Sequence, residues 1–170
     1  GIYFKLQSFI YMPANGLIQG MRPLISYNYG ARHFDRVKKI IKVSIISTAV
    51  ILCCGTIIFM GLPELVLSWF NATEQLLEIG IIGLRVISPC FILSTMGVVI
   101  SGVFESLGKG RQSLTISLLR QFIITLPLAY ILLKVIGLNG IWLSFVIAEG
   151  IASVISVILI KKELHNFKVD

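Results

Sequence analysis

Residues 40–62 read IIKVSIISTAVILCCGTIIFMGL, and the only charged side chain in this stretch is Lys42, close to its start. A helix needs roughly 20 apolar residues to cross the hydrocarbon core of a bilayer, which is about 30 Å thick. The stretch has this length, and it is followed by Pro63, a residue that ends helices. It is therefore predicted to be a transmembrane helix.

The composition of the whole chain supports a membrane protein. Of the 170 residues, 56% are hydrophobic and 14% are charged, whereas soluble domains have about 25% charged residues. A soluble domain of this size cannot bury so much apolar surface, so the excess is expected to face lipid. The net charge of +7 comes from Lys and Arg between the hydrophobic runs. This placement indicates orientation in a bilayer and argues against a nucleic acid as partner.

Four further hydrophobic runs predict an all-α bundle of about five transmembrane helices, all in a single transmembrane domain that covers residues 1–170. The predicted helices cover about residues 3–29, 40–62, 76–107, 114–136 and 141–160. The chain opens inside a hydrophobic run, and we interpret it as a fragment of a longer polypeptide.

The loop charges predict an orientation for the bundle. Five Lys or Arg follow the first helix, two lie in the turn Gly108–Arg111, and three lie in the tail after residue 160. The opposite side has only Lys5 and Lys134 among basic residues, together with three glutamates. Because positive charges favour the cytoplasmic side, we expect the tail in the cytoplasm and residue 1 outside.

Polar side chains share one face of the first predicted helix, at the spacing i, i+4, i+7 and i+11. They are Asn15, Gln19, Arg22 and Ser26. Such a stripe either lines a wet cavity or forms a hydrogen-bonded seam with another helix. Pro13 and Pro23 favour the cavity, because prolines free backbone carbonyls in the broken helices of transporters.

Charged residues deep in the membrane are a second group of candidates, because a charge at the bilayer centre costs at least about 2.5–3.5 kcal/mol. Arg85 and Glu149 lie at similar predicted depths, and we expect them to form a polar cluster that either fixes helix packing or relays protons. Arg120 lies nearer the cytoplasmic end and is expected to extend to the interface. Glu105 is expected to pair with Lys109 at i+4.

The chain has no motif of an enzyme or a metal protein. Cys53, Cys54 and Cys90 form no metal-binding pattern, so no metal site is expected. Residues 105–113, ESLGKGRQS, lack the spacing of a phosphate-binding loop. HExxH and GxSxG are also missing from the sequence. A transport function would therefore draw its energy from an ion gradient or from a domain outside this chain.

A set of residues in the first predicted helix and its exit resembles the eighth helix of bacterial MATE (multidrug and toxic compound extrusion) transporters. These residues are Pro13, Gly16, Gln19, Pro23, Tyr27, Asn28, Gly30 and Ala31. Later segments are similar to the family's last helices and the turn before them: Leu107–Gly110, Leu119–Gln121 with Pro127, and Gly137–Trp142 with Ala148 and Glu149.

The resemblance implies a fold and a function. The chain would be the C-terminal lobe, without its first helix, of a twelve-helix transporter in the bacterial plasma membrane. Such a protein exports organic cations and amphipathic drugs in exchange for Na⁺ or H⁺. It alternates access between this lobe and an N-terminal lobe and uses no cofactor. Asn15, Gln19, Arg22 and Ser26 would then line the cavity. The third predicted helix has no acid before Glu105, so coupling acids are expected mainly in the other lobe.

Three alternatives stay open at this point. One is a flippase of the same wider superfamily that moves a lipid-linked oligosaccharide. Such flippases tend to have more cationic cavities, whereas the helices here contain three arginines. The second is a membrane-embedded enzyme, which would need a converging set of catalytic side chains. The third is an inactive, truncated remnant.

Overall fold

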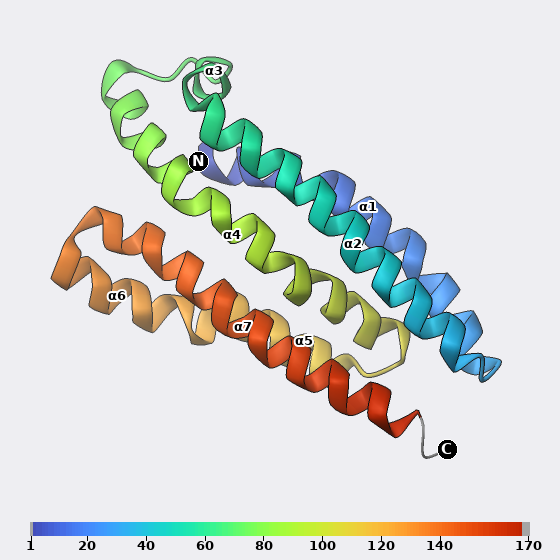
Figure 1. Cartoon of the computed structure of the whole chain (residues 1–170). Coiled ribbons are helices and arrows are strands. Elements are labelled where there is room, and N and C mark those ends of the chain that lie inside the picture. The colour runs from blue at the N-terminus through green and yellow to red at the C-terminus, as the bar shows by residue number, and fades with distance from the viewer. Residues whose placement is uncertain (1, 168–170) are drawn as a thin grey trace.

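The computed structural model describes residues 2–167, and the regular structure in this range is entirely helical. This confirms the predicted all-α class. The helices in chain order are α1 (Ile2–Gly30), α2 (Phe34–Gly61), α3 (Pro63–Ser68), α4 (Glu74–Ser106), α5 (Gly110–Leu118), the π-helical turn η1 (Leu119–Ile123), α6 (Thr125–Ile136) and α7 (Leu138–Asn166), as Figure 1 shows.

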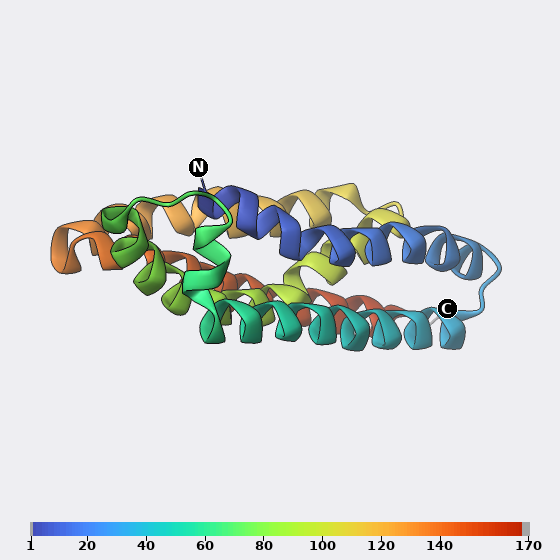
Figure 2. The ribbon, with the colours of Figure 1, turned by 90° about the horizontal axis from the view of Figure 1, so that it is seen from above.

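Helix α4 is the centre of the bundle. It packs against α7 and α2 most extensively and also contacts α1 and α5. Fifteen of its residues are buried, among them Phe91, Val99 and Phe104. Seen from above, α2 and α7 lie in one layer, and α1 and the α5–α6 segment lie in the other (Figure 2). Every long segment of the fold therefore has a neighbour that covers one of its sides.

The outer surface of the bundle is apolar. Four helical segments are long and apolar enough to cross a membrane: Phe34–Gly61, Glu74–Ser106, Gly110–Ile136 and Leu138–Asn166. Large side chains such as Ile57, Val135 and Val154 are more than half exposed. A surface of this kind suits lipid and not water. Helix α1 is as long as these segments, with 29 residues, but its sequence is more polar.

The prolines do not break α1 in the way that the sequence suggests. Pro13 and Pro23 lie inside a continuous helix, and Pro89 lies inside α4 in the same way. The departure from α-helical geometry within the long segments lies before Pro127, where η1 separates α5 from α6. A helix accommodates proline where the surrounding packing compensates for the missing hydrogen bond.

Candidate functional site

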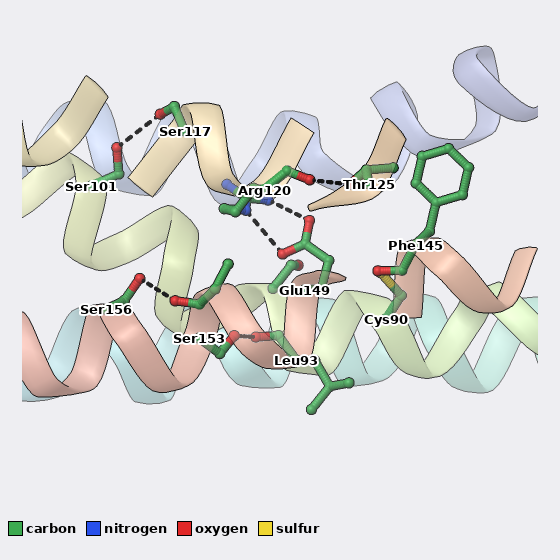
Figure 3. A network of polar contacts seen from close by, with 12 residues as sticks. Cys90, Leu93, Ser101, Ser117, Arg120, Thr125, Phe145, Glu149, Ser153 and Ser156 are labelled. Carbon is green, nitrogen blue, oxygen red and sulfur yellow. Dashed lines mark hydrogen bonds and ion pairs between the residues drawn. The ribbon is translucent and has the colours of Figure 1, made fainter. Parts of the chain in front are cut away.

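A buried ion pair joins η1 to α7 in the interior of the bundle. Arg120 donates two hydrogen bonds to the Glu149 carboxylate, Nε to Oε2 and Nη2 to Oε1, both 2.9 Å long. The two side chains are 13% and 12% exposed, and Figure 3 shows them pointing toward each other from the two helices. A bidentate pair of this geometry is the strongest form of the Arg–carboxylate contact. It compensates the cost of removing both charges from water.

The turn that carries Arg120 has an identifiable cause in the sequence. Pro127 has no N–H group, and its ring clashes with the carbonyl of Ile123 in a regular helix. The chain responds with a π-helical turn, in which the Ile124 N–H donates to the Leu119 carbonyl over 3.4 Å. The Thr125 hydroxyl then donates to the Arg120 carbonyl over 2.6 Å. The π turn therefore fixes the backbone from which Arg120 reaches α7.

Helix α4 leaves the space that the arginine stem needs. A Cβ atom added to Gly97 would lie 2.9 Å from Cδ of Arg120 and 3.1 Å from its Nε. Neighbouring polar contacts hold α4 in place. The Ser153 hydroxyl donates to the Leu93 carbonyl, and the hydroxyls of Tyr11 and Ser94 bond to each other. The ion pair thus lies where α1, α4, η1 and α7 meet.

Gly97→Ala is expected to weaken the ion pair. The new methyl group overlaps the arginine stem, and the guanidinium cannot move aside because Glu149 holds it from the other side. We expect a loss of about 1–3 kcal/mol in stability, typical of overpacking. The melting temperature of the full-length protein in detergent measures this loss. Gly16→Ala is the control, because its Cβ atom would have nothing within 4 Å. Equal melting temperatures for the two variants would contradict the prediction.

The predicted pair of Arg85 and Glu149 does not form. Arg85 is exposed and, with Glu64, borders a hollow of about 490 Å³ where α2, α3 and α4 meet. The prediction is wrong because it matched depth and ignored rotation about the helix axis. Helix α4 presents Gly83 and Gly97 to α7 and η1, and Arg85 lies about 200° around the helix from Gly83.

The predictions for the other charged residues also need correction. Arg120 does not extend to the interface but turns inward to Glu149. Glu105 pairs with Arg22 of α1 over 2.7 Å. Lys109 pairs with Glu163 of α7, also over 2.7 Å. The last two pairs tie the end of α4 to α1 and to α7, so they connect helices that are distant in sequence.

The polar stripe of α1 lies on one side of the helix, as the spacing predicts. Asn15, Gln19 and Ser26 are exposed, and Arg22 is half exposed. Within residues 2–167, Asn15 and Gln19 make no side-chain hydrogen bond. Ser26 donates to the carbonyl of Ser106 over 2.8 Å. The end of the stripe nearest the basic loop therefore docks on α4, whereas the middle of it is uncovered in this chain.

The residues that carry the family resemblance in α1 are also at the surface. All except Asn28 are exposed: Pro13, Gly16, Gln19, Pro23, Tyr27, Gly30 and Ala31. A Cβ atom on Gly16 or Gly20 would have nothing within 4 Å, so no neighbour in the described part of the chain uses the GxxxG pair. Asn28 is buried and donates to the Leu24 carbonyl over 2.8 Å. The motif thus belongs to a face that this chain does not bury.

Arg120 is the site residue whose role the sequence reasoning missed, although the sequence has a signal for it. The turn at Gly137 joins α6 and α7 into an antiparallel hairpin, and Thr125 and Glu149 are each twelve residues from Gly137. Arg120 lies five residues beyond Thr125, which is about 7.5 Å along a helix. The long arginine side chain can cover this offset, so hairpin symmetry places its guanidinium near Glu149.

Known proteins similar to this chain are membrane transporters. The MatE protein-family profile matches residues 1–131. The multidrug export protein MepA of Staphylococcus haemolyticus is 29% identical over 171 residues, which is all of this chain and 37% of MepA. The multidrug export protein MepA of Staphylococcus aureus strain bovine RF122 / ET3-1 is 28% identical over 170 residues, with the same shares covered. The chain therefore spans little more than a third of these relatives.

Solved structures share the fold. The outward-facing conformation of a multidrug resistance MATE family transporter of the MOP superfamily superposes with a TM-score of 0.93 at 19% identity. The match covers 98% of this chain and 38% of that one. The MATE multidrug transporter DinF-BH gives a TM-score of 0.87 at 29% identity, and the match covers 97% of this chain and 37% of that one. The family predicted from the motif of α1 is confirmed: the chain belongs to the MATE family of multi-pass membrane transporters, which are not enzymes.

Proposed function

We propose that this chain forms most of one lobe of a secondary multidrug exporter, and that the whole protein exchanges cationic or amphipathic drugs for Na⁺ or H⁺. Membership of the MATE family and the similarity to multidrug export proteins over the full chain support this proposal. The observation that carries it is the face of α1 with Asn15 and Gln19, which is polar and exposed in an otherwise apolar bundle.

The face of α1 is suited to an aqueous path between two lobes. Polar side chains on a helix at membrane depth are costly against lipid, so they are expected to meet water, substrate or another protein segment. Asn15 and Gln19 offer amide donors and acceptors, and Arg22 is held by Glu105 at the end near the basic loop. We assign Asn15, Gln19, Arg22 and Ser26 to the lining of the cavity that alternates in access.

We assign the Arg120–Glu149 pair to helix packing within the lobe, in preference to a proton relay. Its carboxylate accepts two hydrogen bonds from a cation that is itself buried. A relay needs a carboxylate that can release its partner and bind a proton, whereas this pair resists both. The pair supports the rigid-body movement that alternating access requires of a lobe.

The orientation that we propose puts the start of α2 and the end of α7 in the cytoplasm. The loop charges support it, because Lys and Arg gather at the end of the bundle where α1 passes into α2, α4 into α5, and α7 ends. Figure 1 shows these three regions at the same end.

Expression of the full-length protein in bacteria that lack their own exporters is expected to lower the accumulation of ethidium several-fold. The effect should vanish when an uncoupler and a sodium ionophore together collapse the ion gradients, because the chain has no nucleotide-binding motif. Cellular fluorescence measures accumulation. Asn15→Leu/Gln19→Leu should restore accumulation to the empty-vector level at unchanged abundance. Accumulation equal to that of the empty vector with the unmodified protein would refute the proposed function.

A further inference from the structure

A second polar site lies away from α1, between the start of α2 and the end of α7. A hollow of about 330 Å³ is lined there by Lys38 of α2 and by Lys161, Leu164 and His165 of α7. Helices α2 and α7 flank α4 in their layer, and α1 with its polar stripe lies in the other layer (Figure 2). The hollow therefore belongs to a side of the bundle that the proposed transport path does not use.

Aromatic packing fixes the two helix ends that form the hollow. The rings of Phe34 and Phe167 stack with their centroids 4.9 Å apart. Tyr29, from the end of α1, packs against both rings, at 6.0 Å and 5.5 Å. Phe167 is 8% exposed, so the end of α7 is held in the core and not free in solution. The positions of Lys38 and Lys161 are consequently set by the fold.

The cations of the hollow have no anionic partner in the described part of the chain. The ion pairs formed within residues 2–167 join Arg22 to Glu105, Lys109 to Glu163, and Arg120 to Glu149. Glu163 is thus occupied, although it lies on α7 between the lining residues. Asp35, one turn before Lys38, is exposed and forms no ion pair in this range. Unpaired cations around a hollow favour an anionic ligand.

The helix faces that run from the hollow into the membrane become apolar. On α7, Val154, Ile158, Lys161 and His165 follow each other at i, i+4, i+7 and i+11, so they form one stripe. Val154 and Ile158 are both 60% exposed. On α2, the corresponding stripe from Lys38 continues through Lys42 to Ile45 and Ala49. Each stripe is therefore cationic at the membrane boundary and apolar further in, which matches the two parts of a lipid molecule.

We propose that the hollow binds the headgroup of an anionic phospholipid from the leaflet at this end of the bundle. Lys38 and Lys161 contact the phosphate, and His165 donates a hydrogen bond to a headgroup oxygen. The acyl chains lie along Val154 and Ile158. The lipid fills the space between α2 and α7 and links the two ends of the lobe. Juxtamembrane lysines are known to attract anionic lipid by charge, and here the fold also gives them a shaped site.

Binding of short-chain lipids to the delipidated full-length protein in detergent tests the proposal. Dioctanoyl phosphatidylglycerol is expected to bind at least tenfold more tightly than dioctanoyl phosphatidylcholine. Lys38→Gln/Lys161→Gln should weaken phosphatidylglycerol binding about thirtyfold, because each lysine near a lipid surface contributes about fivefold. Native mass spectrometry or a fluorescence titration measures the affinity. Lys38→Arg/Lys161→Arg should retain it.

The matched control is Lys39→Gln/Lys162→Gln, which removes the same charge from the adjacent positions, outside the hollow. It should change the affinity by less than about threefold, because the contact is direct and not a general field. If the double glutamine variant does not elute as a single species, Lys161→Gln alone should weaken binding about fivefold. Three results would overturn the proposal: equal affinity for the two lipids, an equal loss in the control, or displacement of the lipid by millimolar inorganic phosphate, which indicates a free-anion site.

Discussion

Glu149→Leu is expected to destabilise the full-length protein by roughly 3–5 kcal/mol, because it leaves the Arg120 guanidinium buried without its counter-charge. The side chains of the pair are 13% and 12% exposed, so water cannot replace the lost carboxylate. The expected result is a large drop in the amount of protein in the membrane and in its melting temperature in detergent. Quantitative immunoblotting and a thermal unfolding assay measure the two effects.

The double variant Arg120→Leu/Glu149→Leu is the control for this prediction. Replacing both charges by apolar side chains removes the uncompensated charge, and it is expected to recover most of the stability. If the pair serves packing, the recovered protein should transport ethidium with an unchanged dependence on pH. A double variant with normal abundance and an altered pH profile would instead support the proton relay. A Glu149→Leu protein with the parent's melting temperature would contradict the buried pair.

Gly140→Ala is expected to be the most damaging exchange of a glycine in the bundle. A Cβ atom at this position would lie 2.3 Å from the carbonyl oxygen of Leu132 and 2.5 Å from its carbonyl carbon. Both are backbone atoms, so no side-chain rotation relieves the overlap, and α6 must move away from α7. The expected net loss is about 2 kcal/mol or more, even after the gain of about 1 kcal/mol that alanine brings to a helix.

Gly150→Ala on the same helix is the matched comparison for Gly140→Ala. Its Cβ atom would have its nearest neighbour, Cδ1 of Leu93, at 4.0 Å. It should therefore be neutral or slightly stabilising. Melting temperatures of the two variants in the same detergent decide the question. Similar values would mean that α6 and α7 do not approach as closely as this structure has them.

The helical class of the fold could be predicted from sequence for a simple physical reason. Lipid offers no hydrogen bonds to the backbone, so a long apolar run has to form a helix. Runs such as residues 40–62 therefore carry the answer in their composition. The periodic spacing of Asn15, Gln19, Arg22 and Ser26 was also sufficient to place them on one side of α1. Both inferences depend only on local sequence.

The partners of the buried charges could not be predicted in the same way. Hydropathy gives the depth of a residue, and depth suggested Arg85 as the partner of Glu149. The partner also depends on the rotation of each helix and on which helices are neighbours, and these come from packing across the whole bundle. Gly97 illustrates the point, because its role is to leave space for Arg120. A missing side chain leaves no mark in hydropathy.

The π turn at Leu119–Ile123 has a consequence for how the chain can change in evolution. An extra residue in one turn shifts the angular phase of everything after it by about 100°. Helices α5 and α6 therefore follow two separate phases, and a single helical wheel drawn through residues 110–136 mixes their inner and outer faces. A one-residue deletion within the turn would reset the phase. The inward positions of α6 would then carry lipid-facing side chains, with no change in composition or hydropathy. Such a deletion is expected to be far more harmful than most substitutions in the same turn.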